Sequence, residues 1–349
     1  MSDETEGGRE PEDGGAPLPR ATTAFFGHNE AEQALLDAYR GGRIPHAWLI
    51  GGPPGIGKAT LAYRMARFVL AHPDPAAKLV QEAASLAVDP DNPVAHRVAN
   101  QSHTDLLILE RVVNDKGKLN SVIRVDEARR SVSFFGSTAG EGGWRVSIID
   151  VVEEMHPSAM NSLLKVLEEP PPRSLFLLIT HSPGAALPTI RSRCRRLLLR
   201  PLSETDVRRA AATALGRAPD DAELTVAASV AGGSVARALA MLDGDALALR
   251  QRMAALLAAL PGTDPRALHA LGETLGGPDP RNFTVFVDIM NDWLSARLTT
   301  GPQDTPRLAR VATAFEKLNA AAQEVEEYNL DRKPFVFSAF GTLAEAVRD

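Results

Sequence analysis

The chain has 349 residues, of which 44% are hydrophobic and 23% charged, and its formal net charge is -6. This composition is typical of a soluble globular protein, and the length predicts two or three domains. The single cysteine, Cys194, excludes an intrachain disulfide and any zinc site built from several cysteines. No apolar run reaches the roughly 18 residues that a membrane-spanning helix needs, so we expect no membrane span.

Residues 1–22 form the first predicted segment, an acidic tail rich in glycine and proline. Within 1–20 six acids oppose two bases, a balance of -4: Asp3, Glu4, Glu6, Glu10, Glu12 and Asp13 against Arg9 and Arg20. Such a segment is predicted to be disordered, and without an apolar stretch it is not a secretory signal. The rest of the chain is nearly neutral, which argues against a dedicated nucleic-acid binder; any DNA contact is expected to be local or shared with partner chains.

Residues 23–201 are predicted to form an α/β domain. Asn29, followed three residues later by Glu32, predicts a helix start with a capping box. Five short apolar runs alternate with amphipathic helices and predict a parallel sheet covered on both faces: 46–50, 106–109, 145–150, 175–180 and 197–200. Two of the helices are predicted at 58–70 and 158–168.

After Pro201 the pattern changes to helices rich in alanine and leucine, with no further strand candidate. Residues 202–245 predict a small helical domain, and residues 246–349 a separate all-helical domain. Apolar side chains at helical spacing predict the core of this last domain: Phe283, Phe286, Ile289, Met290, Trp293 and Leu294.

The strongest motif is a glycine-rich segment between the first predicted strand and the helix that follows. It reads Gly52-Pro53-Pro54-Gly55-Ile56-Gly57-Lys58-Ala59 and matches the phosphate-loop pattern G-x-x-x-x-G-K. Glycines let backbone N–H groups turn toward phosphate oxygens, and the lysine neutralises the terminal phosphates. A chance glycine-rich turn is the alternative, and the strand–loop–helix context favours the phosphate loop.

Two chemical groups that ATP hydrolysis needs are missing. Ala59 replaces the Ser or Thr hydroxyl that binds magnesium, and Thr60 is turned about 100° further around the helix. Asp150 ends a strand and could hold a magnesium-bound water, but Val151 stands where an acid commonly polarises the attacking water. Nucleotide binding is therefore expected to be weak or vestigial, without hydrolysis. Two later acids are interpreted as solvated residues at a helix entry: Glu153 and Glu154.

Further segments resemble the AAA+ clamp-loader family, and within it the delta-prime subunits of bacterial DNA polymerase III. Residues 41–49 resemble the family's G-R-x-x-H-A lead into the first strand, and residues 161–171 its N-A-L-L-K-x-L-E-E-P-P helix. Ser192-Arg193-Cys194 matches the S-R-C motif of clamp loaders. The remaining matches lie in the helical part: Gly233-Ser234 with Ala238-Leu239, similar to the start of the sensor-2 helix, and 329–333, similar to the end of the collar domain.

The departures from the family pattern favour delta-prime over the motor subunits. Motor subunits are expected to keep a Ser or Thr after the loop lysine and an acid after Asp150. The motor lid motif reads G-S-x-R-x-A-L, whereas here Ala236 stands at the arginine position and Arg237 lies one step around the helix. Sensor 1 falls within 180–182, and its residue stays open.

The resemblance also implies the domain architecture. The α/β domain is expected to be an AAA+ P-loop domain with sheet order 51432, residues 202–245 its helical lid, and residues 246–349 a helical collar that carries most oligomer contacts. Many relatives insert a zinc module of four cysteines after the phosphate-loop helix. This chain has no cysteine there, so we expect no zinc and no required cofactor.

Arg193 acquires a specific role from the resemblance, that of an arginine finger acting in trans. A guanidinium at a subunit edge can reach the terminal phosphates of ATP bound to the neighbour. Two other readings stay open: a solvated basic strip with Arg191, Arg195 and Arg196, and a contact with DNA phosphates. Cys194 is interpreted as a small buried residue, not a nucleophile.

The function implied by the resemblance is that of a cytoplasmic stator in the clamp loader of DNA polymerase III, active in DNA replication. The implied partners are the tau/gamma motor subunits, the delta subunit and the polymerase holoenzyme, and, through the complex, the sliding clamp and primer-template DNA, with no membrane. Two alternatives stay open. One is an active tau/gamma-type ATPase, against which Ala59 and Val151 argue; the other is an AAA+-derived scaffold outside replication.

Overall fold

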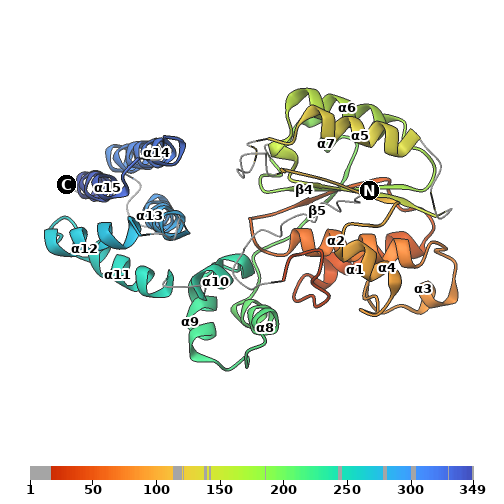
Figure 1. The fold of residues 1–349 in the computed structure, drawn as a ribbon, viewed down its shortest axis with the longest axis horizontal. Coiled ribbons are helices and arrows are strands. Elements are labelled where there is room, and N and C mark those ends of the chain that lie inside the picture. The colour runs from red at the N-terminus through yellow and green to blue at the C-terminus, as the bar shows by residue number, and fades with distance from the viewer. Residues whose placement is uncertain are drawn as a thin grey trace, which may run out of the picture. The chain divides into compact units, whose positions relative to one another are not determined.

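The computed structural model describes residues 17–112, 120, 122–136, 140, 143–184, 186–242, 246–277, 281–299, 304–328 and 330–347. The chain divides into two compact units, Met1–Leu239 and Ala240–Asp349 (Figure 1). Most of the predicted disordered tail lies outside the described residues. The finer division into three domains, at 201 and 245, stays a prediction.

A five-stranded parallel sheet forms the centre of the first unit. Its order is β2-β3-β4-β1-β5, which, counted from β5, is the expected 51432. Each predicted strand is present, and the fifth begins two residues before its predicted start. The strands are β1 (Ala47–Gly51), β2 (Leu106–Glu110), β3 (Arg145–Asp150), β4 (Ser174–Thr180) and β5 (Arg195–Leu198).

Helices cover both faces of this sheet, as Figure 1 shows. On one face lie α1 (Asn29–Arg40), α2 (Lys58–Ala71), α3 (Lys78–Glu82) and α4 (Pro93–Ala99); on the other lie α5 (Val125–Gly136), α6 (Pro157–Glu168) and α7 (Pro188–Arg191). Strand β4 is buried along its whole length, and its side chains alternate between the two cores. Leu177 packs with α1 and α2, and Leu178 packs with α6, as the two-residue period of a strand requires.

The start of α1 differs from the predicted capping box. His28 is the N-cap residue, and its side chain makes no capping hydrogen bond. Glu32 is only 9% exposed, and its Oε1 accepts hydrogen bonds from Arg64 Nε at 2.5 Å and from Leu86 N at 3.0 Å. A buried carboxylate needs such partners to offset its lost hydration. Glu32 therefore ties α1 to α2 and to the segment after α3.

Three helices follow β5 in the first unit and at its end: α8 (Glu204–Leu215), α9 (Ala222–Val230) and α10 (Val235–Leu242). In the ranges that the structure describes, no strand follows β5. The change from alternating strands and helices to helices alone occurs where the sequence predicted it, after Pro201. The turn before α10 is tied to the segment between β5 and α8, because Leu202 N donates to Gly233 O at 3.1 Å.

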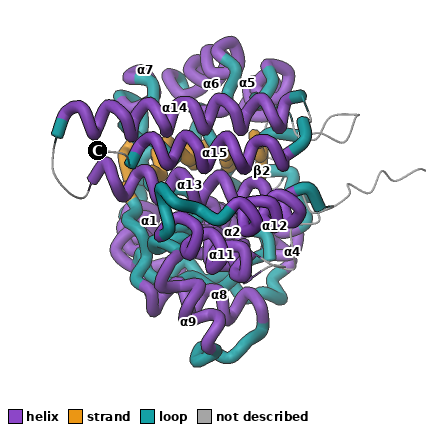
Figure 2. The backbone as a smooth tube through the Cα atoms, turned by 90° about the vertical axis from the view of Figure 1, so that its left-hand side faces the viewer, coloured by secondary structure: helices purple, strands orange, loops and turns teal. Residues whose placement is uncertain are grey.

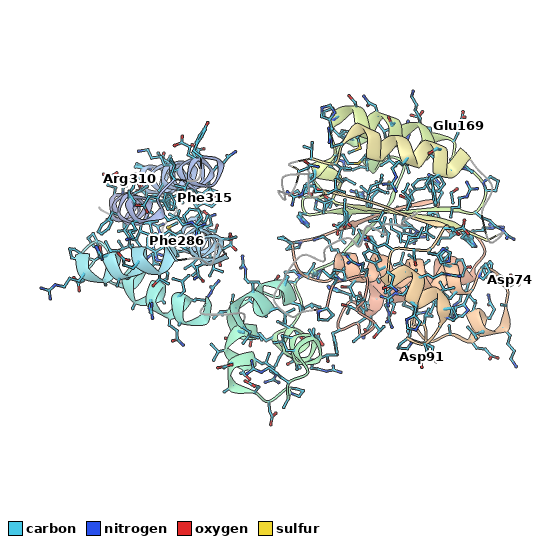
Figure 3. The ribbon with its side chains drawn as sticks, in the orientation of Figure 1. Asp74, Asp91, Glu169, Phe286, Arg310 and Phe315 are labelled. Atoms are coloured by element: carbon cyan, nitrogen blue, oxygen red, sulfur yellow. The ribbon has the colours of Figure 1, made fainter. Side chains whose placement is uncertain are left out.

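The second unit is helical in all its described parts. Its elements are α11 (Ala246–Ala258), α12 (Pro265–Leu275), α13 (Arg281–Thr299), α14 (Thr305–Glu327) and α15 (Arg332–Ala346). Figure 2 shows α13, α14 and α15 side by side. Figure 3 labels Phe286 and Phe315 within this unit. The predicted core is confirmed, with Trp293 partly buried against five buried side chains: Phe283, Phe286, Ile289, Met290 and Leu294.

The segment that resembles the end of a collar domain joins α15 to α12. Asp331 caps α15, and Arg332 donates to Leu275 O, the last residue of α12, at 3.1 Å. Lys333 pairs with Glu273 at 2.7 Å. Asn329 lies outside the described residues. Among the described helices of the whole chain, none is both long and apolar enough to cross a membrane.

Candidate functional site

The glycine-rich motif forms a loop between β1 and α2, which is the predicted context of a phosphate loop. Gly52, Gly55 and Gly57 have φ angles of 149°, 75° and 100°. Residues with a Cβ atom rarely adopt positive φ angles, whereas glycine adopts them at little cost. Glycine at these positions therefore permits the loop to fold back on itself. Gly52 N donates to Thr180 O at 3.3 Å, which anchors the start of the loop to the end of β4.

Lys58 is buried, with 3% of its surface exposed. Its ammonium donates hydrogen bonds to two carbonyl oxygens of its own loop, Gly52 O at 2.7 Å and Pro53 O at 2.5 Å. Burial lowers the pKa of Lys58 to about 8, while the charges of Asp150 and Glu153 raise it. The ammonium is therefore stabilised within the fold by its own loop and two nearby acids.

The position after Lys58 does not fit a magnesium ion. Ala59 offers only a methyl group, and it packs against the buried core around α1 and α2. Thr60 follows on α2, one residue further around the helix. In the described ranges no group of three or more His, Cys, Asp or Glu side chains could hold a metal ion. That the protein needs no zinc and no other cofactor stays a prediction.

The lid motif packs directly against the phosphate loop. Ala236 N, in the first turn of α10, donates to Gly55 O at 3.2 Å, and a Cβ atom at Gly55 would lie 2.2 Å from Ser234 Oγ. Gly233 is equally confined, since a Cβ there would lie 2.8 Å from Leu202 O. Arg237 follows on α10, and its backbone N donates to Ser234 Oγ at 3.3 Å. The loop therefore contacts the start of α10 through Ala236 N and lies close to the side chain of Ser234, whereas Gly233 contacts the segment after β5.

A histidine that the sequence did not indicate contacts the loop from a second side. His28 Nε2 lies 2.9 Å from Ile56 O, and its ring lies near that of Phe25, with centroids 6.1 Å apart. Burial lowers the pKa of His28. The position just before the first helix is the only sequence signal for this contact, and it does not specify the loop as partner.

Asp150 ends β3 beside Glu110, its partner in the register of β2. Burial raises the pKa of Asp150 to about 6, and the charge of Glu110 adds to this rise while that of Lys58 opposes it. Val151, at the position of the water-polarising acid, is 5% exposed and belongs to the core on the α1–α2 face. This position is therefore hydrocarbon inside the protein, and its side chain cannot act on a water molecule.

Glu153 is exposed and lies in the short 3-10 helix Val152–Glu154, in agreement with the interpretation of a solvated acid at a helix entry, but its carboxylate also has partners within the protein. Its Oε1 accepts hydrogen bonds from Thr180 Oγ1, from His181 N at 2.8 Å and from Ser182 N at 2.8 Å. Burial raises the pKa of Glu153, but these hydrogen bonds outweigh burial and hold the pKa below its usual value. Glu153 therefore fixes the segment after β4, where sensor 1 was expected. Glu154 also has a partner, Arg111, at 2.7 Å.

Arg193 lies between α7 and β5, and its side chain is 32% exposed. Its Nη2 donates to Glu168 Oε1 at 2.6 Å, and its Nη1 donates to Thr189 O at 3.0 Å. Cys194 is 8% exposed, which confirms that it is a small buried residue, and burial raises the pKa of its thiol to about 12. Arg195 and Arg196 are exposed, and the guanidinium of Arg195 also lies over the Trp48 ring, 5.0 Å from its centroid.

A protein-family model described as "DNA polymerase III, delta subunit" matches residues 27–203. The DNA polymerase III subunit delta' of Escherichia coli is 30% identical over 241 residues, which cover 68% of this chain and 67% of that protein. This chain belongs to the DNA polymerase III delta-prime family. The corresponding subunit of Pseudomonas aeruginosa is 38% identical over 164 residues, 46% of each chain.

Gamma and tau subunits of DNA polymerase III match this chain as well. DNA polymerase III subunit gamma/tau of Mycobacterium tuberculosis is 29% identical over 293 residues, 76% of this chain and 47% of that protein. Across several relatives the matched region spans about half of their length. The delta-prime assignment confirms the resemblance drawn from the motifs.

The contact between the loop and the lid predicts a specific sensitivity at Gly55. Gly55→Ala is expected to lower the free energy of unfolding by roughly 1–3 kcal/mol more than Gly42→Ala, measured by urea denaturation. Both glycines have positive φ (75° and 68°), so both variants incur backbone strain, but a Cβ at Gly42 meets nothing within 4 Å. Equal losses for the two variants would contradict the contact.

Asp150 predicts a pH-dependent stability. Because its pKa is raised from 3.8 to about 6, the folded state binds this proton more tightly, and stability falls as pH rises between those values. Asp150→Asn removes this penalty, so the variant is expected to gain stability relative to the native protein by up to about 3 kcal/mol at pH 7 and to lose that advantage near pH 3. Unfolding curves at several pH values test this, and an advantage independent of pH would contradict it.

Proposed function

We propose that this protein acts in a DNA polymerase III clamp loader as a stator that does not hydrolyse ATP itself. In this role Arg193 acts on ATP bound to a neighbouring motor subunit. Membership of the delta-prime family supports the assembly, and the site supports the division of labour. The observation that carries the proposal is the burial of Val151 in the core at the position of the water-polarising acid.

Ala59 and Val151 affect two separate requirements of phosphoryl transfer. Without the hydroxyl at Ala59 a magnesium ion loses a ligand, and without a carboxylate at Val151 the attacking water loses its orientation. Each effect alone is expected to lower the rate by orders of magnitude, because this reaction depends on positioning and electrostatic stabilisation. Nucleotide binding by the loop is then weak or vestigial, since Lys58 already has carbonyl partners.

Arg193 suits the complementary task of assisting a neighbour. Its guanidinium is partly exposed, permanently charged and held between Glu168 and Thr189. A fixed planar cation of this kind can stabilise the charge that develops on transferring phosphate oxygens. The proposed neighbours are tau/gamma motor subunits, with a delta subunit, a sliding clamp and primer-template DNA completing a cytoplasmic assembly.

Substitution of Arg193 tests the proposed role in trans. In a reconstituted clamp loader where only the adjacent motor subunit keeps its loop lysine, Arg193→Ala is expected to lower ATP turnover by about 10³ or more. Arg193→Lys keeps the charge but not the planar donors, and is expected to restore little of the rate. Native mass measurement should show that the assembly remains intact.

Arg191→Ala is the matched control within the same basic strip. Arg191 donates to Gly184 O at 3.1 Å and is expected to be replaceable without loss of turnover. Equal losses for Arg191→Ala and Arg193→Ala would favour a diffuse basic surface over a finger. Unchanged turnover with Arg193→Ala would reject the role in trans.

A further inference from the structure

We propose that Glu168 is a positioning residue that orders the guanidinium of Arg193 before the neighbouring subunit docks. This inference rests on the proposed role of Arg193 in trans. The observation behind it is the ion pair between Arg193 Nη2 and Glu168 Oε1 at 2.6 Å, which joins two motifs 25 residues apart in the sequence. The acid is the last residue of α6, and the arginine follows α7.

The position of Glu168 is fixed by the packing of α6. The residues before it anchor α6 in the core, with Leu163 and Leu167 at most 1% exposed. The helix ends at Glu168, and the prolines that follow prevent its continuation. Glu168 itself is 51% exposed at the side chain, so it is held by the helix and not by its own burial.

The backbone of Arg193 is equally well anchored. The N–H groups of Arg193 and Cys194 both donate to Ile190 O at 3.1 Å, and Ile190 is fully buried. Cys194, the next residue, is 8% exposed. The Cα position of Arg193 is therefore set by the core, and the freedom that remains belongs to its long side chain.

Glu168 restricts that remaining freedom. Nη1 of Arg193 is directed to Thr189 O and, at 3.4 Å, to Ser192 Oγ, while Nη2 is directed to Glu168. The first two partners lie on the arginine's own turn, so only Glu168 attaches the guanidinium to a separate element among these contacts. An arginine side chain loses considerable rotamer freedom when it is ordered at an interface, and prior ordering reduces that loss.

Variants of Glu168 test this inference in the full assembly that contains one active motor site beside Arg193. Glu168→Ala is expected to lower kcat for ATP about two- to fivefold, in keeping with the modest strength of a partly exposed ion pair, and to leave KM for ATP unchanged. Glu168→Gln retains an oxygen acceptor at the same place and is expected to recover most of the rate.

Glu169→Ala is the matched control. Glu169 is the adjacent exposed acid, labelled in Figure 3, and no ion pair between it and Arg193 is found. The Glu169→Ala substitution removes the same charge one residue away from Glu168, and ATP turnover is expected to stay at the native level. An equal loss with Glu169→Ala would assign the effect to surface charge and overturn the inference.

The combination with Arg193→Ala separates positioning from a structural role. If Glu168 acts through the guanidinium, Glu168→Ala causes no further loss once Arg193 is gone. An additional loss in that background, native turnover with Glu168→Ala, or a rise in turnover would each overturn the inference. If Arg193→Ala does not change turnover, the role in trans is rejected, and the inference with it. If Arg193→Ala lowers turnover but Glu168→Ala does not, only the inference about Glu168 is rejected.

Discussion

The buried ammonium of Lys58 is the interaction around which the phosphate loop and its neighbours are arranged. A buried cation requires compensating partners, and here two carbonyl oxygens of the loop provide them, with Asp150 and Glu153 nearby. The backbone of the loop must therefore curl around the lysine, which the positive φ angles of its glycines allow. Gly55 is then placed where the start of α10 can pack without a side chain between them.

The phosphate loop and Arg193 lie at different ends of the strands of the same parallel sheet. Strands β1, β3 and β4 end at the loop, at Asp150 and at Thr180, whereas the connection into the edge strand β5 bears Arg193. The methyl group of Ala59 and the side chain of Val151 pack with the core on the α1–α2 face, so the proposed absence of a magnesium ligand and a water-polarising acid at these positions is compatible with an intact sheet.

Local patterns in the sequence predicted the strands and the helical region, because burial on both faces of a sheet demands apolar runs. Strand β5 was placed two residues late because Arg195 and Arg196 are exposed at the edge, where pairing depends on the backbone. The strand order came from the family resemblance. Partners of polar side chains were not predictable, since contacts such as those of Glu153 and Glu168 join residues 25 or more positions apart and leave no periodic signal.

We propose that this protein has a phosphate loop but lacks the means to hydrolyse ATP. The most direct test is steady-state ATP turnover by the purified chain, with DNA present, compared with its Lys58→Ala variant under the same conditions. We expect both proteins to remain at the background rate. Turnover by the native chain that Lys58→Ala abolishes would contradict it.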